Sequence, residues 1–208
     1  MVGAEKAMVD LVRKRQVEQG WLVQHSEGLK TAFRVVFGLV WLLDGSLKFA
    51  PGLVGQFPGL VTQAGHRQPA WLQPWFSFWA AQAAGNPAFW VYFTGTLELA
   101  LAFCLLFGFL RKIAYVGGIL LSLLIWAVPE GFGGPYGPGA TDIGTGIVYG
   151  VLFLALITLN AGYGPSRWSL DFYIEERWPR WGAWAEFQKL VPPEDLNSIP
   201  IERRRSGS

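Results

Sequence analysis

Four stretches of apolar residues are long enough, or nearly so, to cross a lipid bilayer as helices. A bilayer core takes about 20 residues of helix, because each residue advances the helix by about 1.5 Å. The stretches cover residues 31–50, 88–110, 113–128 and 142–161, and the third is slightly short. The sequence therefore predicts an all-α fold, an integral membrane four-helix bundle.

Lysine and arginine residues are sorted to one side of these predicted spans. They gather before the first span, in the turn between the second and third, and after the fourth. The loop of residues 51–87 holds only Arg67, and the loop after the third span holds none. Because cytoplasmic loops carry the excess of basic residues, we expect both termini in the cytoplasm and the chain in the cell inner (plasma) membrane. The charged leader is too long for a signal-peptide n-region, so we expect the first span to act as an uncleaved insertion signal.

This topology divides the chain into a cytoplasmic N-terminal segment (1–29), a four-helix domain (30–175) and a cytoplasmic amphipathic tail (176–208). Prolines and aromatic residues in 51–87 predict an aromatic outer loop that lies in the interface and roofs the bundle. The second outer loop, 129–142, is too rich in Gly and Pro for regular structure. In the tail, aromatic residues alternate with charges, which favours an interfacial helix. The alternative for the tail is a docking surface for a soluble partner.

Ionisable residues inside the predicted spans are the most informative positions, since each is costly at the bilayer centre. The first span contains a stripe at helical spacing, expected to face the bundle because lipid would penalise it: Arg34, Gly38, Trp41, Gly45 and Lys48. Asp44 lies four residues before Lys48 and can pair with it.

The second span contributes Glu98, about ten residues or roughly 15 Å below its outer end, which is near the midplane. Trp126 and Glu130, at the outer end of the third span, add to a common rim. We expect the polar positions to line one pocket open to the outside, at increasing depth: Lys48 and Asp142, then Asp44 and Tyr149, then Glu98.

Most of these residues also have a simpler interpretation. Lys48 is close enough to the surface to extend its ammonium group to the interface. Arg34 could equally reach the inner headgroups, Asp142 suits an N-cap of the fourth helix, and Tyr149 suits a packing residue. Glu98 is too deep to reach the interface, so it must be neutral, paired or exposed to water.

Several classes of site are excluded by composition. The single cysteine, Cys104, excludes an intramolecular disulfide, a CxxC redox pair and a cysteine zinc site. His25 and His66 lie outside the spans, which leaves no bis-histidine haem in the bilayer. The sequence holds no metal or flavin motif. The net charge of +2, with basic residues sorted by membrane side, does not favour nucleic-acid binding.

Three segments together resemble the DoxX/DoxD family over residues 30–175. FRVVFGLVWLLDGSLKFAP carries an arginine, a glycine and a G-x-x-K-F element, and LELALAFCLLFGFLRKIA carries a glutamate and an LxxG-aliphatic-R ending. The segment from 134 to 171 carries an aspartate, a membrane tyrosine and a final G-x-S-x-x-S-x-D. The positions that match the family pattern are Arg34, Gly45, Lys48, Glu98, Asp142 and Tyr149. The resemblance implies a small four-helix membrane protein, similar to the membrane subunit of a thiosulfate:quinone oxidoreductase.

A quinone-linked redox subunit is the first functional hypothesis, with sulfur compounds such as thiosulfate as candidate electron donors. A quinone headgroup needs a hydrogen-bond donor at each carbonyl and a proton source, and Glu98 could relay protons at midplane depth. The candidate catalytic residues are Glu98, Lys48 and Asp44; those for binding the quinone are Arg34, Trp41, Trp126, Tyr149 and Asp142. The electron carrier would come from a partner subunit.

A non-catalytic membrane anchor or assembly subunit is the second hypothesis. The buried charges would then fix the helix register, and the tail and outer loop would dock a partner or a second copy of the chain. A transporter is least favoured, because the two halves show no internal repeat.

Overall fold

The computed structural model describes residues 2–66, 68–134, 143–164 and 166–187, with side chains from 25 onward except at 163. This part of the chain is all-α: it contains eight α-helices, three short 3₁₀ turns and no strand. The helices are α1 (Val2–Leu47), α2 (Leu53–His66), α3 (Gln73–Gly85), α4 (Pro87–Phe107), α5 (Arg111–Ala127), α6 (Thr145–Tyr163), α7 (Leu170–Arg177) and α8 (Gly182–Ala185).

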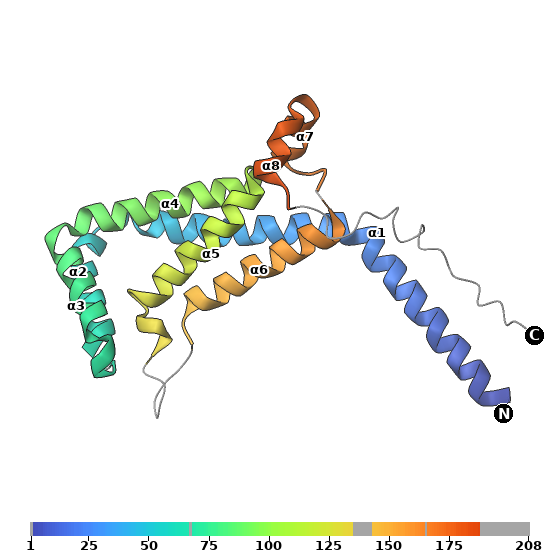
Figure 1. Cartoon of the computed structure of the whole chain (residues 1–208), viewed down its shortest axis with the longest axis horizontal. Helices are drawn as coiled ribbons and strands as arrows, with labels where there is room; N and C mark the ends of the chain where they lie inside the picture. Colours follow the sequence, from blue (N-terminus) through green and yellow to red (C-terminus); the bar gives the residue numbers. More distant parts are fainter. Residues whose placement is uncertain (1, 67, 135–142, 165, 188–208) are drawn as a thin grey trace, which may run out of the picture.

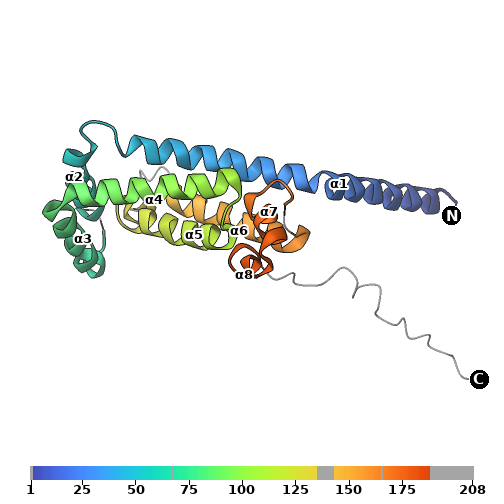
Figure 2. The same cartoon turned by 90° about the horizontal axis from the view of Figure 1, so that it is seen from above.

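The long helices form an elongated bundle in which α1 lies beside α4 and α5 lies beside α6 (Figures 1 and 2). Helices α2 and α3 pack together at one end of the bundle, here called the α2–α3 end. Helices α7 and α8 lie at the other, the α7–α8 end. The first half of α1 projects from the bundle beyond the α7–α8 end (Figure 2). The two clusters of polar side chains described below lie at these two ends.

Local sequence signals explain where α4 begins and ends. The Asn86 side chain accepts a hydrogen bond from the Phe89 N–H at 3.1 Å, and Pro87 occupies the first turn, where its missing N–H costs nothing. Gly108 ends the helix with a φ of +64°, a left-handed conformation that glycine adopts without strain. The chain can therefore turn directly into α5.

Aromatic rings fill the middle of the bundle, where Phe153 lies 4.8 Å from the ring of Phe37 and 5.9 Å from that of Trp41. All three side chains are buried, and the stripe predicted to face the bundle is buried at Arg34, Gly38, Trp41 and Gly45. Gly118 brings α5 close to this cluster: a Cβ atom there would meet the Phe153 ring at 2.2 Å.

The structure extends or divides three of the predicted elements. The first predicted span is the second part of a 46-residue helix that already begins at Val2, within the segment 1–29. The predicted outer loop contains two helices, α2 and α3: Pro74 lies in the first turn of α3, where its missing N–H costs nothing, whereas Pro58 lies inside α2. The predicted tail helix is divided within the described part into α7 and α8, since Pro179 lacks the N–H needed to continue α7.

Two of the described helices are long and apolar enough to cross a membrane, at Pro87–Phe107 and Thr145–Gly162. They correspond to the second and fourth predicted spans. The first and third predicted spans are also helical, but α5 has 17 residues and the corresponding part of α1 contains Arg34, Asp44 and Lys48. By length and composition alone, these two helices are weaker candidates.

We expect Gly118→Ala to lower the thermal unfolding temperature of the purified protein in mild detergent. The added methyl group would overlap the buried Phe153 ring, and such overpacking costs about 1–3 kcal/mol. The control is Gly117→Ala, where a Cβ atom meets nothing within 4 Å and the gain in helix propensity is up to about 1 kcal/mol. Equal unfolding temperatures for the two variants would contradict the close packing of α5 on Phe153.

Candidate functional site

An ion pair joins Lys48, the residue that follows α1, to the buried Glu98 of α4, toward the α2–α3 end. Lys48 Nζ lies 3.2 Å from Glu98 Oε2, and the Glu98 side chain is 1% exposed. Gly95 lies one turn before Glu98 on α4, and a Cβ atom there would come within 2.7 Å of Lys48 Cβ. The missing side chain at Gly95 therefore makes room for the lysine stem, which lets the ammonium group reach the carboxylate.

Asp44 and Tyr149 form a second polar contact, between α1 and α6. The Tyr149 hydroxyl donates a hydrogen bond to Asp44 Oδ2 at 3.1 Å. Asp44 thus bonds across the bundle to α6, while Lys48 pairs with Glu98 rather than with Asp44. The structure therefore brings four of the predicted site residues into two neighbouring pairs, here called the polar seam: Asp44, Lys48, Glu98 and Tyr149.

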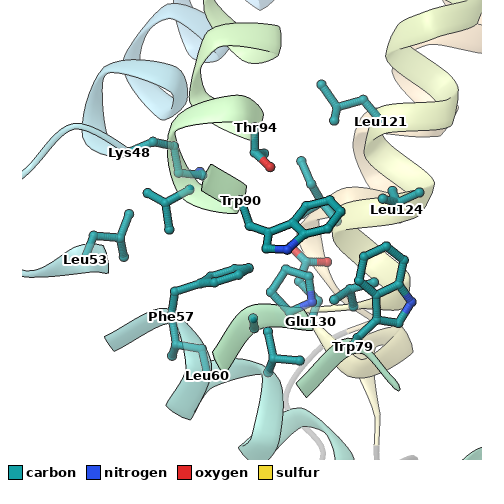
Figure 3. A pocket seen from close by; sticks show the side chains of 16 residues that line it. Lys48, Leu53, Phe57, Leu60, Trp79, Trp90, Thr94, Leu121, Leu124 and Glu130 are labelled. Carbon is teal, nitrogen blue, oxygen red and sulfur yellow. The ribbon is translucent and has the colours of Figure 1, made fainter. Parts of the chain in front are cut away.

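A cavity of about 300 Å³ adjoins the polar seam at the α2–α3 end. It is walled mainly by apolar side chains of α2, α3, α4 and α5, including the rings of Phe57, Trp79 and Trp90. Figure 3 shows Lys48 and Thr94 on one side and Leu121 and Leu124 on the opposite side, with Phe57 and Leu60 below. The polar groups at its wall come from Lys48, Thr94 and Glu130. Its size and mixed lining suit a small, largely apolar ligand with a few polar atoms.

The remaining predicted site residues have other environments. Trp41 is fully buried in the aromatic cluster and does not line the cavity. The Trp126 indole donates to the Ile143 carbonyl at 2.8 Å, and Trp126 is likewise absent from the cavity wall. Asp142 lies outside the described residues. Glu130 Oε2 accepts the Gly146 N–H of the first turn of α6 at 2.9 Å.

Arg34 lies at the opposite end of the bundle from the cavity, within a second polar cluster. Its guanidinium donates to the Trp168 carbonyl at 2.6 Å, and its side chain is almost fully buried. A role for Arg34 in holding a ligand in the 300 Å³ cavity is therefore excluded by position, and Lys48 is the predicted cation that lies there.

Asp171 is the centre of this second cluster, although it comes from α7. Its carboxylate accepts four hydrogen bonds, from the backbone N–H groups of Leu110 and Arg111, from Arg111 Nε and from Trp181 Nε1, at 2.8, 3.0, 3.1 and 2.9 Å. Arg111 also contacts Glu186. Leu110 has a φ of +47°, a strained value for a residue with a side chain, and Asp171 bonds to its N–H. Asp171 therefore holds the α4–α5 turn in place from α7.

Sequence reasoning missed the aromatic wall of the cavity and the part of Arg111 and Asp171. Phe57, Trp79 and Trp90 belong to three different helices, so no local spacing joins them. Arg111 was used only as a topology signal and as the last residue of a family-like motif. The sequence offered one hint of the ion pair between Arg111 and Asp171: a basic residue lies just after the second span and an acidic residue lies after the fourth.

Comparisons of the chain with protein-family models, with curated proteins and with solved structures find no match. Within the described ranges, no group of three or more His, Cys, Asp and Glu side chains could hold a metal ion. Function must therefore be argued from the cavity and the polar seam themselves.

We expect Asp171→Asn to destabilise the protein by about 1–3 kcal/mol, because the buried Arg111 guanidinium loses the negative charge beside its Nε while its contact with Glu186 remains. Thermal unfolding in detergent measures the loss, and limited proteolysis should cut the α7–α8 segment sooner. The control is Glu176→Gln, which changes an exposed carboxylate on the same helix. If Asp171→Asn unfolds and is cleaved in the same way as the wild type, this cluster does not hold the α7–α8 segment in place.

Proposed function

We propose that this chain is an integral membrane protein whose four long helices cross the bilayer with both termini in the cytoplasm. Large apolar side chains point outward from all four helices, among them Leu43 of α1, Phe93 of α4, Leu120 of α5 and Leu154 of α6, which are 62%, 47%, 62% and 54% exposed. Charged groups are inside, as Glu98 and Arg111 illustrate. A surface that is apolar around a polar interior suits lipid better than water.

Labelling of single cysteines would test this topology. In a Cys104→Ser background, Ser77→Cys on α3 should react with a membrane-impermeant thiol reagent in intact cells, because α3 faces outward in the proposal. Glu176→Cys on α7 should react only after permeabilisation. Both positions are exposed, so accessibility to water does not differ between them in the structure. Labelling of Glu176→Cys in intact cells would show that the orientation is the reverse of the one proposed.

The cavity carries a proposal for activity: the chain is the quinone-binding membrane subunit of an oxidoreductase related to the DoxX/DoxD proteins that it resembles. The observation behind it is an apolar cavity of about 300 Å³ with three aromatic rings and, at its edge, an ammonium group paired to a buried carboxylate. Flat apolar rings suit stacking on a quinone ring. The Lys48 ammonium and Thr94 hydroxyl are donors for a quinone carbonyl oxygen.

Reduction of a quinone to a quinol takes two electrons and two protons. The Lys48 ammonium would donate one proton to a bound quinone and be reprotonated through Glu98, which lies beside it, and the Asp44–Tyr149 pair of the polar seam would serve the second proton. The electrons would come from a partner subunit that carries a redox group, with a sulfur compound such as thiosulfate as the candidate donor. Lys48 and Glu98 are therefore the residues proposed for the chemistry, with Asp44 and Tyr149 in support.

A second candidate function is a non-catalytic membrane anchor or assembly subunit. The first half of α1 projects from the bundle (Figure 2), and aromatic side chains near the α7–α8 end are strongly exposed, with Trp168 at 73% and Trp178 at 66%. Both features offer surface to a partner subunit or to membrane lipids.

Quinone binding is the deciding measurement. Protein purified in mild detergent should bind short-chain ubiquinone or menaquinone analogues, and Ala83→Leu should weaken that binding at least tenfold by filling the cavity with three extra carbon atoms. The matched control is Ala81→Leu, two residues earlier on α3 but exposed and absent from the cavity wall. Trp79→Leu, which removes one ring of the wall, should also weaken binding.

Purification of the wild-type protein separates the two candidate functions. Co-purified quinone supports the redox subunit, whereas a stoichiometric partner without any bound or bindable quinone supports the anchor. Equal affinity of the Ala83→Leu and Ala81→Leu variants for quinone would place any quinone site elsewhere.

A further inference from the structure

Three cationic side chains meet around a small niche at the α7–α8 end. The niche has a volume of about 10 Å³, and its wall includes Lys30, Arg34 and Arg111 together with Thr31, Tyr115 and Asn160. Arg34 is 3% exposed and Arg111 is 1% exposed. A space of this size admits one oxygen-sized group.

Arg34 is a buried guanidinium with few partners. Its Nη2 donates a hydrogen bond to the Trp168 carbonyl, and its Nε and Nη1 atoms have no hydrogen-bond partner within the described part of the chain. The same holds for Arg111 Nη1. Buried N–H groups that lack an acceptor are strongly unfavourable, and more so when they carry charge. Two guanidinium groups therefore present unused donors beside the niche.

The nearby carboxylates do not satisfy these donors. Asp171 already accepts four hydrogen bonds, and Glu186 accepts from Arg111 and from the Asn160 amide. Burial raises the pKa of the Glu175 carboxyl and so favours its neutral form, although Arg111 acts in the opposite direction. Glu27 pairs with Lys30 at 2.7 Å. Arg34 forms no ion pair within the described ranges.

Backbone geometry holds the Arg34 guanidinium where it is. Gly108 has a φ of +64°, and a Cβ atom there would overlap Arg34 Nη1. The glycine that ends α4 thus leaves the space in which the guanidinium lies, between α1 and the α4–α5 turn. A donor set fixed in this way needs no rearrangement to accept a ligand oxygen.

We propose that this niche binds a phosphate group, one oxygen of which sits between Arg34 and Arg111. Guanidinium groups bind tetrahedral oxyanions through several charge-assisted hydrogen bonds. The phosphate comes either from a lipid headgroup or from free phosphate in solution. The site is separate from the quinone cavity. It depends on the proposed topology only if the ligand is a lipid, because the α7–α8 end must then lie at the level of the headgroups.

Ligand-dependent stability of the full chain in neutral detergent tests the proposal. Inorganic phosphate should raise the unfolding temperature relative to chloride at equal ionic strength, or phosphatidylglycerol should do so relative to detergent alone. A rise with phosphate alone identifies a free anion, and a rise with the lipid alone identifies a headgroup. If neither probe raises the unfolding temperature, the niche holds water only and the proposal fails.

Variants assign any binding to the niche. Arg34→Gln should weaken binding of the effective probe at least tenfold, and Arg34→Lys should also weaken it because the planar fork of donors is lost. Arg180→Gln, which removes an exposed arginine near the same end, should change the affinity less than twofold. Wild-type affinity in Arg34→Gln would overturn the assignment. If that variant does not fold, the Arg34→Lys affinity and the wild-type titration decide.

Quinone binding measured on the same preparations separates the two proposals. Loss of phosphate binding with quinone binding retained concerns only the niche, because the cavity lies at the other end of the bundle. Ala83→Leu should bind the effective probe with wild-type affinity, and loss of phosphate binding in that variant would contradict a niche separate from the cavity.

Discussion

The ion pair between Lys48 and Glu98 is the contact around which the α2–α3 end is organised. A carboxylate that is 1% exposed needs a cation or a proton, and the nearest cation is on a different helix. That requirement fixes the register of α1 against α4, since a shift of one turn would separate the charges by about 5 Å. The cavity lies next to this pair, so its shape depends on the same register.

The two ends of the bundle use buried charge differently. At the α7–α8 end, Asp171 is saturated with four donors and ties α7 to the α4–α5 turn, which is typical of a structural network. At the α2–α3 end, an ion pair faces a cavity and two more polar side chains lie nearby. A carboxylate with four donors resists change, whereas a charge pair at a cavity can exchange partners with a ligand. The unused donors at the α7–α8 end belong to Arg34 and Arg111 and face the small niche. The cavity is therefore the candidate site for the quinone, and the niche is the candidate site for the phosphate.

Periodicity predicted most of the helical framework and much of its polar interior. The stripe from Arg34 to Gly45 is buried because a spacing of three and four places its members on one helix face, and depth alone indicated that Glu98 needs a partner. Distance along the helix could have separated Arg34 from Lys48, since 14 residues span about 21 Å. The partner of Lys48 was not predictable by spacing, because Glu98 reaches it only where Gly95 lets two helices approach. The ring-lined wall depends on three helices packing together, which no local pattern records.

Gly95 has a consequence for the history of this chain. A Cβ atom at this position would lie 2.7 Å from Lys48 Cβ and 3.0 Å from the Phe49 ring, so even alanine would push α1 away from α4. Such a displacement would break the contact between lysine and glutamate and leave a buried charge behind. We therefore expect positions 48, 95 and 98 to change together in evolution: a larger residue at 95 should appear with a changed pair at 48 and 98.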